Sequence, residues 1–585
     1  MKWTGRYQGY QLSSLRQDLI AGSIVGIVAI PLGMAFSIAS GVKPEYGLYT
    51  TIIAGILIAL FGGSRFQIGG PTGAFIPILL AIVMQYGYQN LLIAGFMAGF
   101  FLILMGIFKI GTLIKYIPKP VTIGFTAGIA VTIFTGQIAS FLGLTGMKRH
   151  EDFLSNMREI GLRLPSINFY SVITACLCLA ALLLTPKILP KIPGSLVGLL
   201  ISTLAAAWLF PGQVATIGST YGPISGGWPQ FHWLPISLDQ IVNLIQPALI
   251  IAMLGSIESL LSAVVADGMT GVRHNSNREL IGQGIANMAA PLFGGIPATG
   301  AIARTATNIK NGAVSPISGV VHGFIVLLVV LLFAPYASHI PLASMAPILM
   351  MVAWNMSERK SFTHMLRTKT GDSFILVVTF LLTVLTTLTT AVEAGLALAV
   401  AMFFFQMSRS LKVDKVLPDP TLKNKIMPHM VSEDHDCPQV EIYNMEGPLF
   451  FGVTGSLENS KLRLGEASDL KVLILRMGKV PFMDTTGEAN FAAIVREYIN
   501  LGVLVVVVGL RPQPLSLIKR TGTWDLIGAE RAFEHVDEAL SFALNQVNSS
   551  HCLGCKHLAF RECPVLSSAE SPLRTPGSLQ GSFQQ

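Results

Sequence analysis

One carboxylate stands alone in a long apolar stretch of the chain. Glu258 is the only charged residue between positions 242 and 266, in a run long enough to cross a bilayer. An ionisable side chain at that depth is expensive to keep charged, and such side chains usually have a function. Its protonation could accompany the movement of a solute, although a structural hydrogen bond would also explain a buried glutamate. Ser262 lies one helical turn further on and would face the same site.

Two short apolar segments, 69–75 and 294–302, have closely similar sequences. Each contains Gly-Gly, then proline, then Thr-Gly-Ala and an apolar residue. If the membrane part divides into two halves of seven segments, each is the third segment of its half. Short segments interrupted by glycine and proline at corresponding positions are the mark of a transporter built from inverted repeats. The alternative is a chance similarity in a glycine-rich membrane protein.

The first turns of two such half-helices would form an anion site. The first N–H groups of a helix have no partner within it, and the helix dipole adds partial positive charge there. Inverted repeats would point both ends at the same place, so an anion between them would receive amide hydrogen bonds from both sides. The threonine hydroxyls could add donors, although Thr299 could instead cap its own helix. The anion-binding residues predicted on these segments are Thr72, Gly73, Gly300, Ala301 and Ile302, the last two through their amides.

Arg304 is the second buried charge that the sequence places near this site. It lies one helical turn beyond Gly300 on the same predicted half-helix. Its guanidinium could attract the anion, pair with Glu258, or clamp a backbone carbonyl. An anion and Arg304 together would offset the cost of a charged Glu258, which is one rationale for symport.

The composition requires a membrane to bury the apolar residues. Hydrophobic residues make up 51% of the chain and charged residues only 12%, about half the usual share of charge in a soluble protein. The net charge of +8 comes from lysines and arginines in short loops between apolar runs, which indicates membrane orientation rather than nucleic-acid binding. Lys2, Arg6 and Arg16 place the N-terminus in the cytoplasm.

The apolar runs predict an all-α polytopic membrane domain over residues 1–409. Twelve full spans and the two half-helices make fourteen segments, and the even number returns the C-terminus to the cytoplasm. The predicted full spans are 19–40, 46–62, 92–109, 120–143, 168–185, 194–210, 242–266, 277–293, 314–334, 338–354, 372–391 and 393–408, and the half-helices are 71–85 and 298–310.

Beyond the membrane part the chain changes character. Residues 410–436 are polar and predict a linker. Residues 437–547 predict a small α/β domain, because continuous apolar runs typical of buried strands alternate with helical patterns near 487–501, 512–521 and 535–547. The tail, 548–585, contains a cysteine cluster and ends in a stretch expected to be disordered.

The tail carries residues that could bind a metal. Cys552 and Cys555 form a C-x2-C pair, and Cys563 and His557 could complete a four-ligand zinc site. An iron–sulfur cluster usually needs four thiolates, and only three are local. Unbound reduced thiols are the alternative, because a cytoplasmic tail argues against disulfides.

Several motifs together resemble the SulP family of anion transporters. They are Asp-Leu-Ile-Ala-Gly at 18–22, Pro-Leu-Gly-Met-Ala-Phe at 31–36, Pro-Glu-Tyr-Gly-Leu-Tyr at 44–49, Ser-Leu-Leu-Ser-Ala-Val-Val-Ala-Asp-Gly at 259–268 and Ala-Arg-Thr-Ala-Thr-Asn at 303–308. The α/β part resembles a STAS domain, with Asp-Thr-Thr-Gly at 484–487 in its characteristic loop. The resemblance covers residues 10–545.

The resemblance implies an architecture and further site residues. It implies fourteen segments in two inverted repeats of seven, with half-helices as the third and tenth, a core domain that moves against a gate domain, and usually a homodimer. Phe36 would form another wall of the anion site, unless it is plain core packing. A carboxylate at the position of Glu258 is used for cation coupling in relatives, and glutamate favours protons over sodium.

The resemblance also bears on the STAS loop formed by Asp484, Thr485 and Thr486. Similar domains in bacterial anti-sigma-factor antagonists are phosphorylated in this loop, so Thr485 is a candidate phosphosite and the domain could bind a cytoplasmic regulator. A helix cap formed by Asp484 or Thr485 would explain the same residues.

The sequence thus predicts a secondary transporter of small anions in the plasma (inner) membrane. The preferred prediction is proton-coupled uptake of sulfate or a related oxyanion by alternating access. The alternative within transport is a bicarbonate or C4-dicarboxylate symporter. An anion channel and a STAS-based signalling protein are alternatives of other classes. No catalytic constellation or Walker loop is apparent, so no enzyme activity and no cofactor beyond a coupling H+ or Na+ and the tail zinc are expected.

Overall fold

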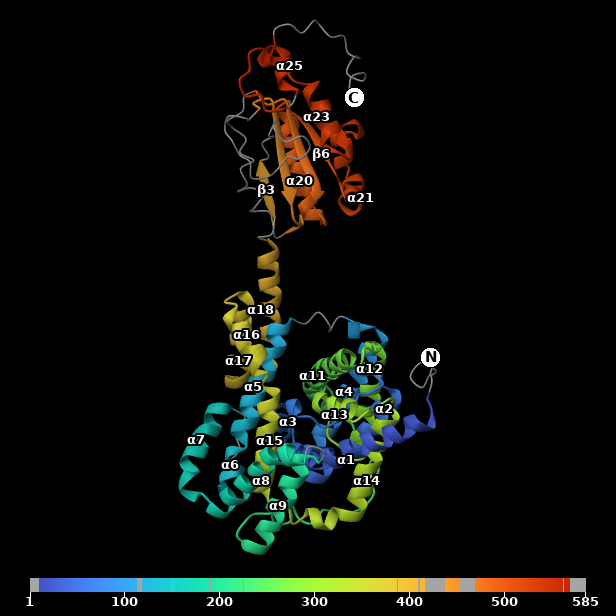
Figure 1. Cartoon of the computed structure of the whole chain (residues 1–585), viewed down its shortest axis with the longest axis vertical. Coiled ribbons are helices and arrows are strands. Elements are labelled where there is room, and N and C mark those ends of the chain that lie inside the picture. The colour runs from blue at the N-terminus through green and yellow to red at the C-terminus, as the bar shows by residue number, and fades with distance from the viewer. Residues whose placement is uncertain are drawn as a thin grey trace. The chain divides into compact units, whose positions relative to one another are not determined.

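The structure is a computed structural model, and it divides into two compact units, Met1–Ala399 and Val400–Gln585 (Figure 1). The residues that it describes are 10–568, apart from 113–117, 149, 151, 190–191, 225, 387, 409–410, 416–436, 452–468 and 561.

The first unit is helical, as predicted. Among the described residues, seven helices are long and apolar enough to cross a membrane, and three apolar helices are shorter. These numbers do not confirm a total of fourteen spans, which stays a prediction. The helices are α1 (Leu12–Ala39), α2 (Pro44–Phe61), α3 (Ile76–Tyr86), α4 (Tyr88–Ile107), α5 (Lys119–Gly136), α6 (Ile138–Leu142), α7 (Phe153–Arg163), α8 (Phe169–Ile188), α9 (Gly194–Leu209), α10 (Ile217–Tyr221), α11 (Leu238–Thr270), α12 (Ser276–Leu292), α13 (Ile302–Lys310), α14 (Ile317–Ala337), α15 (Leu342–Met356), α16 (Arg359–Arg367), α17 (Gly371–Leu385) and α18 (Leu388–Ser408).

Helix contacts in this unit repeat between the two halves of the chain. Contacts of α4 with α12 match those of α14 with α2, and contacts of α1 with α14 match those of α11 with α4. The contact of α5 with α17 likewise matches that of α15 with α8. Helices of the first half, blue in Figure 1, therefore lie among helices of the second half, in green. This pairing is what two repeats of seven segments produce.

The two similar short segments cross each other inside the unit. Gly69–Gly70 (β1) and Thr299–Gly300 (β2) pair antiparallel, with Gly69 opposite Gly300 and Gly70 opposite Thr299. A 3-10 turn, η2 (Gly73–Phe75), and then α3 follow β1, and α13 follows β2. The half-helix predicted at 298–310 was therefore placed too early, because residues 299 and 300 are used for strand pairing.

Side chains satisfy the extended backbone that leads into this crossing. Asn287 both donates to the carbonyl of Ala298, at 2.8 Å, and accepts from its N–H, also at 2.8 Å. Thr50 donates to the carbonyl of Ile296 at 2.9 Å. Extended backbone at membrane depth is tolerated only where protein groups satisfy it, so these side chains permit the crossing.

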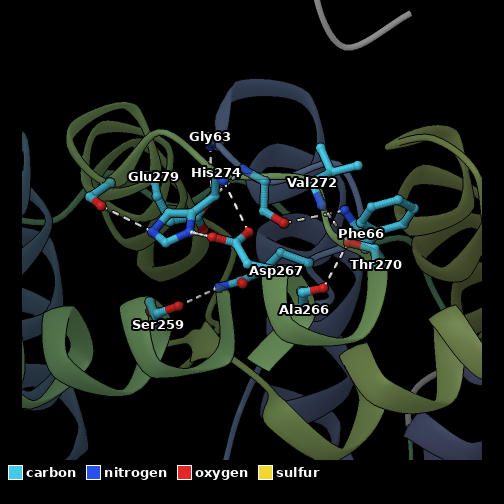
Figure 2. Close-up of polar contacts among 12 residues, drawn as sticks. Gly63, Phe66, Ser259, Ala266, Asp267, Thr270, Val272, His274 and Glu279 are labelled. Atoms are coloured by element: carbon cyan, nitrogen blue, oxygen red, sulfur yellow. Dashed lines mark hydrogen bonds and ion pairs between the residues drawn. The ribbon is translucent and has the colours of Figure 1, made fainter. Parts of the chain in front are cut away.

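The turn from α11 to α12 is fixed by a row of buried and half-buried polar side chains. His274 Nδ1 lies 2.7 Å from Asp267 Oδ2, and His274 Nε2 lies 3.0 Å from Ser276 Oγ (Figure 2 shows the first pair). Glu279 Oε2 accepts the N–H groups of Gly63 and Ser64 at 2.7 and 3.0 Å. This Ser–His–Asp row could not be recognised from the sequence. The side chain of His274 is only 2% exposed, so the row holds the turn and is not open to a substrate.

The second unit contains a five-stranded sheet with helices packed on it (Figure 1). The strand order is β3-β4-β5-β6-β7, and β3 is antiparallel to β4 while the remaining pairs are parallel. The strands are β3 (Lys412–Lys415), β4 (Val440–Glu446), β5 (Val472–Lys479), β6 (Leu504–Val508) and β7 (Ala532–Phe533), and the main helices are α20 (Thr485–Asn500), α21 (Pro512–Thr521), α22 (Thr523–Ile527) and α23 (Val536–Leu544).

The predicted linker and tail each contain ordered elements. Strand β3 lies within 410–436 and is an edge strand of the sheet, so that part of the linker prediction was wrong. The rest of the linker lies outside the described residues. In the tail, α24 (Ser549–Cys552) and α25 (Cys563–Ser567) are helical. The stretch 566–585 was expected to be disordered, but its residues 566 and 567 belong to α25, and its residues after 568 lie outside the described residues.

Candidate functional site

A cavity of about 290 Å³ lies where the crossing segments meet α5 and α15. Helices α1 and α11, together with η2 and α13, form one wall, and α5 and α15 form the other. Its lining residues are Leu32, Phe36, Thr72, Gly73, Ala74, Val121, Thr122, Phe125, Thr126, Met253, Leu254, Ile257, Glu258, Leu261, Ala301, Ile302, Ala303, Arg304, Val352, Asn355, Met356 and Glu358.

Glu258 lies on α11 and faces this cavity, bonded to both crossing segments. Its Oε2 accepts from Thr72 Oγ1 at 2.8 Å and from Thr299 Oγ1 at 2.9 Å. The two threonine hydroxyls lie 3.2 Å apart. Thr72 precedes η2 and Thr299 belongs to β2, so one carboxylate oxygen joins the corresponding positions of the two repeats. A change in its charge would therefore act on both segments.

The backbone amides divide into used and unused donors. The N–H of Gly300 donates to Ser259 Oγ at 3.0 Å, and the N–H of Ala301 donates to the carbonyl of Ile68 at 2.8 Å. The prediction that Ala301 offers its amide to an anion was therefore wrong, because strand pairing already uses that group. Gly300 is not among the lining residues. The first N–H groups of η2 and α13, which include those of Gly73 and Ile302, have no intrahelical partner and border the cavity.

A glycine is required at position 300 for a packing reason. A Cβ there would overlap the side-chain amide of Gln67, whose Nε2 donates to the carbonyl of Ser259 at 3.0 Å. Gly300, which was predicted to bind the anion, thus makes room for the neighbouring side chain of Gln67.

Arg304 acts as a clamp within the crossing. Its Nη2 donates to the carbonyl of Pro71, which is one of the three roles that the sequence left open. It also lines the cavity, and its Nη1 has no hydrogen-bond partner within the described part of the chain. The guanidinium therefore adds positive charge near Glu258 while holding the two repeats together.

The remaining predicted membrane residues lie in different surroundings. Phe36 is 4% exposed and forms part of the cavity wall on α1. Ser262 is fully buried and donates to Thr305 Oγ1 at 3.2 Å, and it is not among the residues that line the cavity. The structure thus brings Phe36 to the site of Glu258 but gives Ser262 a structural bond.

Polar residues of the second wall did not emerge from the sequence. Thr122 and Thr126 on α5, Asn355 at the end of α15 and Glu358, which directly precedes α16, line the cavity. The threonines are spaced four apart and so share one helix face, which was an available signal. That face could be recognised as a cavity wall only once α5 was known to lie opposite the crossing.

The STAS loop caps a helix. Asp484 precedes α20, and its Oδ1 accepts the N–H of Gly487 at 2.7 Å while its Oδ2 accepts the N–H of Phe451 at 3.1 Å. This is the capping role that the sequence left open. Thr485 and Thr486 form the exposed first turn of α20.

The tail residues predicted to bind a metal do not form a ready site. Among the described residues, no three His, Cys, Asp or Glu side chains form a group that could hold a metal ion as they stand. His557 is exposed, whereas Cys552, Cys555 and Cys563 are half-buried.

Comparisons with known families identify both units. Residues 15–379 match the sulfate permease family, and residues 433–539 match the STAS domain. The first match covers more than half of the chain.

Curated relatives and solved structures are similar over most of the chain. "Putative sulfate transporter YvdB" of Bacillus subtilis is 57% identical over 538 residues, which cover 92% of this chain and 99% of that protein. "Bicarbonate transporter BicA" of Picosynechococcus is 29% identical over 91% of this chain and 95% of its own length. The solved structure of SLC26A9 has a TM-score of 0.80 at 20% identity, covers 92% of this chain and 91% of that one, and supports the fold.

Proposed function

The chain belongs to the sulfate permease family, and we propose that it takes up sulfate or a related oxyanion together with protons by alternating access. Family membership makes it a multi-pass membrane anion transporter and not an enzyme. The name of the Bacillus subtilis relative favours sulfate among the possible anions. The coupling to protons is argued from the site.

The single observation that carries the proposal is the bonding of Glu258 to both repeats. Its carboxylate lines the cavity and accepts from Thr72 and Thr299 at 2.8 and 2.9 Å. A charged Glu258 would repel an anion held at the first turns of η2 and α13, and protonation would remove that repulsion. Proton and anion therefore bind together more readily than either does alone, which is the requirement for symport.

The anion would be held by groups from both repeats. The N–H groups of Gly73 and Ile302 offer hydrogen bonds at the positive ends of η2 and α13, and Arg304 adds a full positive charge. Phe36 and the apolar side chains of α5 and α15 exclude water from the bound anion. A compact oxyanion with several acceptor oxygens matches this set of donors.

The arrangement of the helices supports movement of one group against the other. The crossing belongs to the group of α1 to α4 and α11 to α14, whereas α5 and α15 form the opposite wall of the cavity. The cavity is lined by the first turns of α5 and the last turn of α15, which lie on the side of the membrane where α1 begins. Sliding of the first group along the second would carry the anion to the other side.

The charges of the loops support a cytoplasmic N-terminus in a plasma (inner) membrane. On the side where α1 begins, the connections contain Arg65, Lys109, Arg273 and Lys310, among others. On the opposite side, the connections 210–237, 293–297 and 338–341 contain no lysine or arginine, and the basic exceptions are Lys43 in the connection 40–43 and the connection 137–168. By the positive-inside rule, the side where α1 begins and both termini would face the cytoplasm.

The STAS unit is proposed to mediate dimer formation and regulation. The exposed Thr485 and Thr486 at the start of α20 would accept a phosphate at a helix N-terminus, where negative charge is favoured. Mass measurement of the purified chain as a dimer, and phosphorylation that is lost in Thr485→Ala, would support these two roles. A monomer, or an unmodified loop in cells, would count against them.

Uptake into proteoliposomes tests the main proposal. Labelled sulfate, bicarbonate and fumarate are supplied in turn, with an imposed proton or sodium gradient and the membrane potential clamped. We expect sulfate to accumulate against its gradient with protons and not with sodium. Accumulation driven only by sodium would show that the proton is not the coupling ion. Downhill flux without accumulation under either gradient would indicate a channel.

Bicarbonate symport is the second candidate. A relative at 29% identity bears the name of a bicarbonate transporter, and amide donors around a small cavity also suit bicarbonate. Accumulation of bicarbonate without accumulation of sulfate in the same assay would select it, and accumulation of fumarate alone would select a C4-dicarboxylate symporter.

A further inference from the structure

Four of the six cysteines converge at one end of the STAS sheet. Cys437 lies just before β4, Cys552 ends α24, Cys555 follows three residues later, and Cys563 begins α25. Cys437 and Cys563 pack against the same apolar cluster, which includes the buried Phe560. Residues more than one hundred positions apart in the sequence are thus brought to one place.

Hydrogen bonds hold the segments that carry these cysteines together. Gln439 Nε2, two residues beyond Cys437, donates to Cys552 Sγ at 3.5 Å, and its side chain also accepts the N–H of Asn548 at 2.7 Å. The N–H of Gly554, between Cys552 and Cys555, donates to the carbonyl of Ser567 in α25 at 3.2 Å. The C-x2-C turn is therefore bonded both to the start of β4 and to α25.

The four thiols affect one another electrostatically. Burial, and then the nearby thiols of Cys437, Cys555 and Cys552, raise the pKa of Cys563 to about 11. Burial also raises the pKa of Cys437, with smaller contributions from Cys552 and Cys555. Because each of these contributions falls off with distance, they indicate that the four thiols lie near one another.

Backbone amides already point at two of the sulfurs. The N–H of Phe560 donates to Cys563 Sγ at 3.2 Å, and the N–H groups of Gln439 and Val440 donate to the thiol of Cys437. Such bonds stabilise the deprotonated sulfur, which is the form that ligates a metal.

We propose that Cys437, Cys552, Cys555 and Cys563 are the four ligands of one structural zinc ion. Four thiolates are a common ligand set for structural zinc, with tetrahedral geometry. Cys437 takes the place that the sequence had assigned to His557, which is exposed. Since no three of the described side chains stand ready to hold a metal, zinc binding requires the four thiols to draw closer together.

The site would join the tail to the STAS sheet. Because a structural zinc ion stabilises the fold that forms its site, its removal should loosen α24 and α25 from the sheet. Zinc binding by the STAS unit does not depend on proton transport through the membrane unit, so the zinc site can be tested independently of the transport proposal.

Zinc content of the full-length protein, purified in detergent, tests the proposal. Elemental analysis should find about one zinc ion per chain, and Cys437→Ser or Cys555→Ser should lower it at least about tenfold, because a four-ligand site does not tolerate the loss of a thiolate. His557→Ala and Cys176→Ser, a cysteine exposed on α8, are the matched controls and should keep the ion.

A measurement on the unmodified chain guards against variants that fail to fold. Zinc added to chelator-stripped protein should release protons, because the thiols are protonated at neutral pH, and cobalt in its place should give thiolate-to-metal absorption bands. No zinc and no proton release would overturn the proposal. So would iron in the purified protein, retention of zinc by Cys437→Ser, or its loss in His557→Ala.

Discussion

Replacing Glu258 with glutamine separates the charge of this side chain from its hydrogen bonds. Both Thr72 and Thr299 donate to a single carboxylate oxygen, at 2.8 and 2.9 Å, and the amide oxygen of glutamine can accept both bonds. Hydrogen bonds to a neutral acceptor are weaker than those to a charged one by about 1 kcal/mol each, so the crossing should remain intact. The variant loses only the ability to take up a proton.

The expected effect on coupling is large. A gradient of one pH unit supplies about 1.4 kcal/mol for each proton moved, which supports up to about tenfold accumulation of the anion when the membrane potential is zero. In Glu258→Gln the same gradient should support no accumulation, while exchange of anions across the membrane continues. The assay is uptake of labelled sulfate into proteoliposomes, with valinomycin and equal potassium on both sides.

A carboxylate on the same helix provides the control. Asp239 lies in the first turn of α11 and outside the cavity, so Asp239→Asn should keep the full accumulation. Accumulation that persists in Glu258→Gln, at the level of the unmodified protein, would refute the assignment of coupling to this side chain. Loss of coupling in both variants would show that the effect is not specific to the cavity.

Three further perturbations follow from the contacts. Gly300→Ala places a Cβ on Gln67 and should lower the free energy of unfolding by about 1–3 kcal/mol, measured by thermal unfolding in detergent. Gly268→Ala on α11, where the added Cβ meets open space, should not lower it. Equal stability of the two variants would contradict the packing argument. Asp484→Ala removes the cap of α20 and should lower the free energy of unfolding of the STAS unit by about 1 kcal/mol, whereas Thr485→Ala should change it little. A larger loss of stability in Thr485→Ala than in Asp484→Ala would rule out the cap. In zinc-free protein, alkylation of Cys563 should be slow at neutral pH, because only the thiolate reacts. As long as the pH is below the pKa of about 11, the rate should rise about tenfold with each unit of increasing pH. A rate that does not change with pH would contradict the raised pKa.

The sequence predicted the class of the fold and the place of the site for identifiable reasons. The lone Glu258 and the similar segments at 69–75 and 294–302 pointed to one region, and the structure brings all three together. The apolar runs predicted most helices to within a few residues, and the helix 512–521 coincides with α21. Periodicity and the cost of a buried charge are local properties, and a single sequence displays them.

Contacts between distant segments could not be predicted. Ala301 was expected to offer its amide to an anion, but it bonds to Ile68, which lies more than two hundred residues earlier. Strand β3 was assigned to the linker because a four-residue segment with three charged residues shows no strand pattern until β4 lies beside it. Cys437 was not grouped with the tail thiols for the same reason, since only the folded sheet places it near Cys563.

The position of a bound anion tests the account most directly. Selenate has the shape of sulfate and contains an anomalous scatterer, so its place in crystals of the full-length protein can be found from diffraction data. The account predicts a single peak in the cavity, placed so that oxygens of the selenate lie within about 3 Å of the backbone nitrogens of Gly73 and Ile302. A peak outside the cavity, or no peak in protein that transports selenate, would contradict it.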